Sequence, residues 1–117
     1  MIETIVSLET ARLLKEKGYR DELCRHYYDF KGKLQVYNGM LNCPLGDVVD
    51  APTQSSAQQW LRDEKMLVLI IDVDFTELEC YYCNIYDKTR VLQEQTKDCL
   101  TYEEALEEGL KQALKLI

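Results

Sequence analysis

Residues 101–117 read TYEEALEEGLKQALKLI, which is the clearest helical pattern in the chain. Thr101 is a suitable N-cap, and Glu104, three residues later, can complete a capping box with it. One set of residues recurs at steps of three and one, the spacing that places side chains along a single side of a helix: Tyr102, Ala105, Leu106, Gly109, Leu110, Ala113, Leu114 and Ile117. Because such a stripe must be covered by a sheet or by other helices, the segment predicts a folded globular domain.

The charged residues of this segment follow the order that a helix dipole favours. Glutamates crowd its first two turns, whereas Lys111 and Lys115 come late. Glu107 and Lys111 are four residues apart, so we expect them to contact each other on the solvent side of the helix.

The composition is typical of a single soluble domain spanning residues 1–117, with 46% hydrophobic and 30% charged residues. The net charge of −7 disfavours nucleic acid as a partner, because phosphates attract clustered Lys and Arg. The longest apolar run, residues 66–71, is too short to cross a membrane, and the N-terminus lacks a secretory signal. Five cysteines without such a signal indicate reduced thiols, so we expect a cytoplasmic protein that does not bind membranes.

The first part of the chain predicts a helix and, further on, a long loop. The helix is expected over residues 7–17, with Ser7 as its N-cap and Gly18 as its stop. Residues 38–51 contain several Gly, Pro and Asn residues and are expected to form the loop. A short strand at 40–42 is possible within it.

A β-hairpin is predicted between this helix and the loop. Residues 24–30 alternate as a strand does, Lys31-Gly32 signals a turn, and residues 33–37 continue as a second strand. Leu34 and Val36 are expected to face inward.

The second part of the chain predicts another helix and a second hairpin. Thr53 is a suitable N-cap for a helix that ends near Glu64. Residues 66–75 and 80–87 are predicted strands, and residues 88–99 are a polar connector to the last helix. Strand alternation turns one set of side chains inward: Leu67, Leu69, Ile71, Val73, Phe75, Tyr81, Cys83 and Ile85. The order α-β-β-α-β-β-α predicts an α+β fold with a four-stranded, mainly antiparallel sheet and helices packed mostly on one face.

The other face of this predicted sheet carries more apolar and tyrosine side chains than contact with solvent requires. It would combine Val68, Ile70, Tyr82 and Tyr86, joined by Tyr28 or Tyr37. Two interpretations stay open. Either the N-terminal helix or the 38–51 loop covers this face, or the face is a protein interface, for which tyrosine is well suited. A homodimer is the simplest such interface, and Trp60 is a second candidate if its helix is exposed.

The cysteines do not form a recognisable redox or metal site. Cys80 and Cys83 have CxxC spacing, but within a strand they face opposite sides of the sheet and can neither bond to one another nor share a metal. Cys24 and His26 could supply half of a zinc site, yet no second ligand pair at zinc spacing exists. We therefore expect no metal and no cofactor.

Residues 69–76, LIIDVDFT, resemble the first motif of haloacid-dehalogenase-type phosphatases. The resemblance implies that Asp72 is a nucleophile and Asp74 an acid/base, with Mg²⁺ between carboxylate and phosphate. In that family the motif stands near the start of a doubly wound parallel sheet, and a second acidic pair follows a later strand. This chain has no such pair and no other catalytic motif, so we expect a protein that is not an enzyme.

Two resemblances bear on the setting of the protein. The chain resembles small proteins of unknown function from Bacteroidetes genomes and their phages and mobile elements, on the segments SLETA (7–11), KGY (17–19), APTQS (51–55), WLR (60–62), TYEEALEEGL (101–110) and LKLI (114–117). Residues 101–114 are also similar to the helix that follows the sheet in HicB-type antitoxins, which implies an acidic protein that binds a small basic toxin. The chain departs from that family because one helix precedes the first hairpin and another interrupts the sheet.

The sequence thus favours a non-catalytic protein-interaction module of phage or mobile-element origin. Its partner is a protein or a second copy of itself, bound through Val68, Ile70, Tyr82 and Tyr86, with Trp60 as a second surface. A HicB-like antitoxin and a Mg²⁺-dependent phosphohydrolase are the alternatives.

Overall fold

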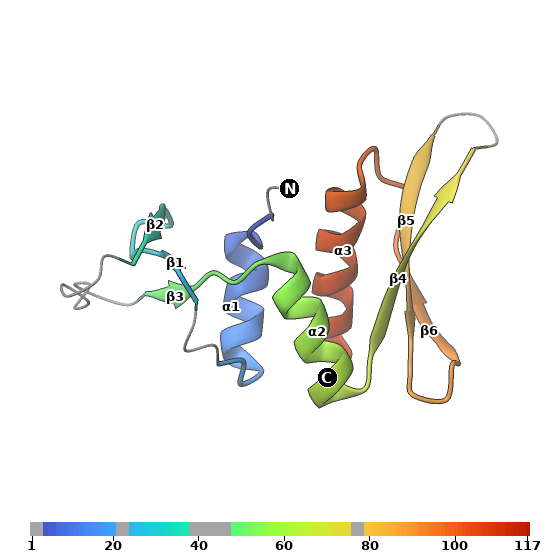
Figure 1. The fold of residues 1–117 in the computed structure, drawn as a ribbon, viewed down its shortest axis with the longest axis horizontal. Helices are drawn as coiled ribbons and strands as arrows, with labels where there is room; N and C mark the ends of the chain where they lie inside the picture. The colour runs from blue at the N-terminus through green and yellow to red at the C-terminus, as the bar shows by residue number, and fades with distance from the viewer. Residues whose placement is uncertain (1–3, 21–23, 38–47, 76–78) are drawn as a thin grey trace.

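A computed structural model of the chain describes residues 4–20, 24–37, 48–75 and 79–117. It is an α+β structure with three helices and two three-stranded antiparallel sheets (Figure 1). In chain order the elements are α1 (Leu8–Glu16), β1 (His26–Tyr28), β2 (Leu34–Val36), β3 (Val49–Asp50), α2 (Gln54–Lys65), β4 (Val68–Asp74), β5 (Cys80–Tyr86), β6 (Leu92–Gln95) and α3 (Tyr102–Lys115).

The last helix, α3, lies at the centre of the fold. It packs on β4 and β5 on one side, and α1 and α2 pack against it on the other (Figure 1). The predicted apolar stripe is buried along most of its length, through Ala105, Leu106, Gly109, Leu110, Ala113 and Leu114. Gly109 permits the close approach to the sheet, because a Cβ atom there would lie 2.4 Å from the Sγ of Cys83.

Local sequence signals set the helix ends as predicted. Each of the predicted N-caps, Ser7, Thr53 and Thr101, accepts a hydrogen bond from the backbone N–H three residues later, at 3.1–3.3 Å. Gly18 follows the end of α1 with a φ of 94°, a conformation that glycine adopts without steric cost.

The prediction of one four-stranded sheet is wrong. The first hairpin pairs with β3 to give the order β2-β1-β3, and the second pairs with β6 to give β4-β5-β6. Both added strands lie in segments predicted as a loop and a connector. The two hairpins do not join each other, because the helices lie between the two sheets (Figure 1). The short strand suggested at 40–42 lies outside the described residues.

The two sheets also differ in how well their inward faces were predicted. In the β4-β5-β6 sheet, Leu69, Cys83 and Ile85 are buried against the helices as expected. Val73 and Phe75 are 37% and 73% exposed, so the prediction that they face inward is wrong. At this end β4 stops at Asp74, and the β4–β5 hairpin reaches beyond α3 (Figure 1). In the small sheet, Leu34 and Val36 of β2 are exposed, so the prediction that they face inward is wrong. Their strand is a three-residue edge strand, too short to carry a buried face of its own.

Glu107 of α3 has a different role from the predicted one. Its Oε2 accepts hydrogen bonds from the backbone N–H of Ser7 at 3.1 Å, from the Ser7 hydroxyl at 2.9 Å and from the Thr10 hydroxyl. Its Oε1 accepts one from Nε2 of Gln54 at 3.0 Å. One carboxylate therefore joins α3 to the beginnings of α1 and α2, at a helix N-terminus where negative charge is stabilised.

Lys111 is correspondingly paired elsewhere. Its Nζ lies 3.4 Å from a carboxylate oxygen of Glu9 on α1 and 3.8 Å from one of Glu108. The expected contact between Glu107 and Lys111 is wrong, because helical spacing alone cannot show that another helix covers this side of α3.

Candidate interaction surface

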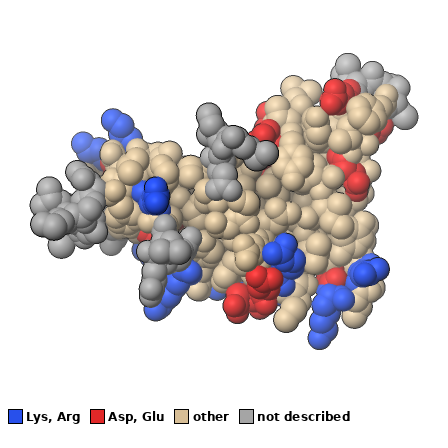
Figure 2. Space-filling model, in the orientation of Figure 1, with Lys and Arg blue, Asp and Glu red and all other residues tan. Residues whose placement is uncertain are grey.

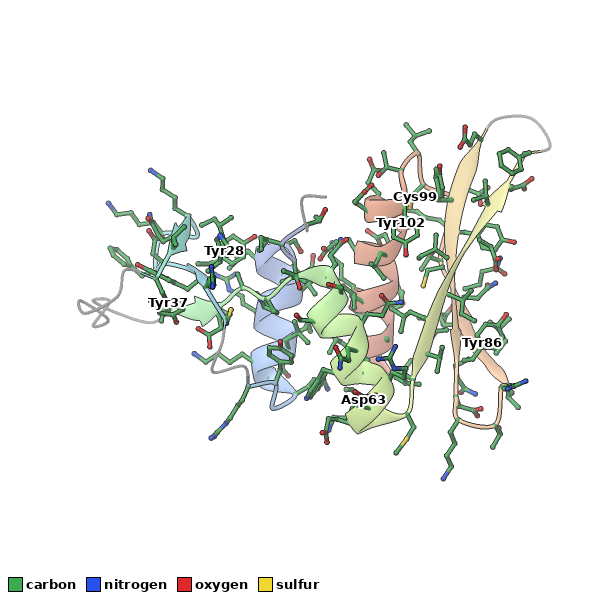
Figure 3. All side chains as sticks on the ribbon, viewed as in Figure 1. Tyr28, Tyr37, Asp63, Tyr86, Cys99 and Tyr102 are labelled. Carbon is green, nitrogen blue, oxygen red and sulfur yellow. The ribbon has the colours of Figure 1, made fainter. Side chains whose placement is uncertain are left out.

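The candidate surface is the side of the β4-β5-β6 sheet that faces away from α3, here called the outward face. All three helices lie on the other side of this sheet (Figure 1). Figure 3 shows Tyr86 on the side of the sheet away from α3. Strand alternation from the buried residues places the following side chains on the outward face: Val68, Ile70, Asp72 and Asp74 of β4, and Cys80, Tyr82, Asn84 and Tyr86 of β5.

The register of the strands arranges these side chains in rows. Val68 pairs with Tyr86, which in turn pairs with Leu92 of β6. The next row is formed by Ile70, Asn84 and Gln95, and the row after it contains Asp72 and Tyr82. The four predicted surface residues of β4 and β5 therefore lie on one continuous face, with the apolar ones gathered at one end.

A polar pair lies in the middle of this face. Asn84 is almost fully buried, and its Nδ2 donates a hydrogen bond of 2.9 Å to a carboxylate oxygen of Asp72. Asp72 and Asp74 lie on β4, which pairs with β5 in the antiparallel direction and places them opposite Tyr82 and Cys80. This sheet differs from the parallel sheet that the phosphatase resemblance implies.

The apolar end of the outward face is hollowed. An open depression of about 490 Å³ is lined by Val68, Ile70, Tyr86, Asp87, Lys88 and Arg90. Val68, Ile70 and Tyr86 make its apolar side, and Asp87, Lys88 and Arg90 at the β5–β6 turn make its charged rim. Such a depression can receive one large side chain of a protein partner.

The turn between β5 and β6 holds this rim in place. Oδ1 of Asp87 accepts hydrogen bonds from the backbone N–H of Thr89 at 2.8 Å, the Thr89 hydroxyl at 2.7 Å and the backbone N–H of Val91 at 3.0 Å. The Thr89 hydroxyl and the Val91 N–H lower the pKa of the Asp87 carboxyl. The sequence prediction missed this turn, although an Asp two residues before a Thr is a known turn signal.

The other aromatic candidates lie away from the outward face. Trp60 lies on α2, on the helical side of the sheet, where its ring meets that of Tyr19 edge to face at 5.4 Å. Tyr28 and Tyr37 belong to the small sheet, so the expectation that one of them joins the face is wrong. The Tyr28 hydroxyl donates to the carbonyl of Val6 at 2.7 Å, and burial raises the pKa of this phenol.

Cys80 and Cys83 are placed as their strand positions predict. Cys80 lies on the outward face, whereas Cys83 is fully buried beneath α3, and burial raises the pKa of its thiol to about 12. The thiol of Cys24 donates to the backbone carbonyl of His26 at 3.2 Å. Among the residues that the structure describes, no group of three or more His, Cys, Asp or Glu side chains could hold a metal ion.

Comparison of the chain with protein-family models, with curated proteins and with solved structures finds no match. Within the described ranges, no helix is both long enough and apolar enough to cross a membrane. The case for a function therefore depends on the shape and chemistry of the outward face.

Proposed function

We propose that the protein is a non-catalytic interaction module that binds a protein partner through its outward face. The observation that carries this proposal is the row of apolar and tyrosine side chains on a sheet face that lies opposite all the described helices. Ile70, at the centre of the face, is 45% exposed, whereas its chain neighbour Leu69 is buried in the core. Tyrosine beside exposed aliphatic side chains is the composition that protein interfaces favour.

A second copy of the chain is the simplest partner for this face. Two-fold dimers are the commonest protein assemblies, and they require only that one surface complement itself. In the phage or mobile-element setting that the resemblance implies, the module would act in the cytoplasm as such a dimer. Trp60 offers a second, smaller contact surface on α2.

The test is the solution mass of the pure protein, measured by light scattering across a range of concentrations. The mass should rise from the 13.7 kDa of a monomer toward twice that value. Tyr86→Glu should weaken association more than about tenfold, because it places a charge in the apolar end of the contact. Val36→Glu, an exposed position in the small sheet, is the matched control and should leave association unchanged.

Two outcomes would contradict the proposal. A monomeric mass at every concentration would show that the protein does not self-associate. Equal weakening by Tyr86→Glu and Val36→Glu, with both variants folded by circular dichroism, would place the contact somewhere other than the outward face.

A further inference from the structure

The outward face has opposite charges at its two ends. Lys88 and Arg90 stand at the end where β5 turns into β6, and Asp72 and Asp74 stand toward the other end. In Figure 2, blue side chains gather at the end of this sheet near the β5–β6 turn, and red ones appear toward its opposite end. The apolar hollow lies between the two cations and the middle of the face.

At the β5–β6 end of the face, the charges available to a partner are those of Lys88 and Arg90. Lys88 and Arg90 are exposed. The nearby Asp87 carboxylate is turned into its own loop, where it accepts bonds from the Thr89 and Val91 N–H groups and from Nε2 of Gln93 at 3.0 Å. The Asp87 carboxylate also lines the hollow, so this end of the face carries two cations against one carboxylate that is bonded to its own turn.

The two ends are separated by the length of β4. Six residue steps from Val68 to Asp74 correspond to about 20 Å of extended strand. The Ile70–Asn84 row lies two residues from the Val68–Tyr86 row and two from the Asp72–Tyr82 row. It is thus the midpoint between the Val68–Tyr86 row and the Asp72–Tyr82 row.

We propose that a second copy packs face to face on the outward face with its strands antiparallel. The two copies are related by a two-fold axis that lies between them and runs along the Ile70–Asn84 row, perpendicular to the strands. This inference depends on the proposed function, since it specifies how the same face is occupied. The axis brings the Lys88 and Arg90 end of each copy over the acidic end of the other. An axis parallel to the strands would instead place like charges together at both ends.

The shape of the face agrees with this arrangement. A rotation about the Ile70–Asn84 row exchanges the Val68–Tyr86 row with the Asp72–Tyr82 row. Tyr82 of each copy then lies over the hollow of the other. Two sheets packed in this way resemble an aligned β-sandwich, in which inner faces lie about 10 Å apart.

The test compares two variants with the same change in net charge. Lys88→Gln with Arg90→Gln removes the two cations from the rim of the hollow. Lys31→Gln with Lys33→Gln removes two from the turn of the small sheet and is the matched control. Dissociation constants are measured by sedimentation equilibrium at about 20 mM and about 500 mM salt, where screening differs strongly.

The expected result is that the Lys88/Arg90 variant dimerises about tenfold more weakly than the control at low salt, with the difference shrinking at high salt. Tighter dimerisation of this variant, or dimerisation equal to that of the control, would overturn the antiparallel arrangement. In that case a wild-type dimer that Tyr86→Glu still splits would preserve the proposed function. A wild-type monomer at all concentrations would overturn both.

Discussion

The β1–β2 and β5–β6 hairpins contain the same turn but stand in very different surroundings. Their sequences are YDFKGKLQ over residues 28–35 and YDKTRVLQ over residues 86–93. In the first, Oδ1 of Asp29 accepts two backbone N–H bonds of 2.9 Å, and in the second, Asp87 accepts equivalent bonds of 2.8 and 3.0 Å. In each hairpin a glutamine six residues after the Asp donates to the second carboxylate oxygen.

What differs is the element that covers each hairpin. Ile85, just before the second turn region, is fully buried beneath α3 in a strand of seven residues. The corresponding residue of the first hairpin, Tyr27, is half-buried in a strand of three residues, and its ring packs against that of Tyr37 at a tilted angle, with the ring centres 4.6 Å apart. The comparison teaches that the turn is a local property, whereas the length and stability of the strands come from packing on a helix.

The largest expected effect is a difference in stability between a buried position of one hairpin and an exposed position of the other. Ile85→Ala should lower the free energy of unfolding by about 2–5 kcal/mol, because it opens a cavity beneath α3. Val36→Ala, in the exposed strand of the first hairpin, should change it by less than about 0.5 kcal/mol. Urea unfolding measures both, and comparable losses would show that α3 is not the source of the difference.

A smaller effect should appear at the left-handed position that both turns contain. Gly32 has a φ of 80°, and a Cβ there would also lie 3.2 Å from Leu8, so Gly32→Ala should cost about 1 kcal/mol or more. Arg90 occupies the equivalent position with a φ of 66°, and Arg90→Gly should stabilise the protein by up to about 1 kcal/mol. Thermal unfolding of the two variants should thus shift in opposite directions, and shifts of the same sign would show that the turns are not equivalent.

The smallest expected effect is the acid sensitivity of the turns. The N–H of Lys33 lowers the pKa of Asp29, and the Thr89 hydroxyl lowers that of Asp87, from an ordinary value of 3.8. Because the folded pKa is the lower one, the stabilisation is present above pH 3.8 and is lost as the pH falls through the folded value. Asp29→Asn and Asp87→Asn should each flatten the decline of stability between pH 5 and pH 2 in urea titrations. If stability declined with pH as steeply in the variants as in the wild type, the turns would not stabilise the ionised carboxylates.

Much of the fold could be predicted because its signals are local. The caps at Ser7, Thr53 and Thr101 act on N–H groups three residues away, and alternation assigned Cys83 and Ile85 to the buried face. The two-sheet arrangement could not be predicted in the same way. All four residues of β6 are exposed, so this strand has no apolar alternation to detect.

The candidate surface was only partly predictable for the same reason. Alternation in β4 and β5 was enough to group Val68 and Ile70 with Tyr82 and Tyr86. The charged rim was missed, because Lys88 and Arg90 lie in a segment without periodicity, and only the Asp87 turn brings them beside the apolar row. Trp60 was a candidate on residue type, and its packing depends on a contact with Tyr19, beyond the end of α1, that sequence spacing does not show.

The Glu107 carboxylate has a consequence for the order in which the molecule assembles during synthesis. Ser7 begins the first helix, but the side chain that receives its N–H is encoded 100 residues later. At about 5–20 residues per second, that interval is roughly 5–20 s of translation. During this time α1 has neither its acidic partner nor the helix that covers its apolar side. α1 therefore docks against α3 only after the α3 segment has been made.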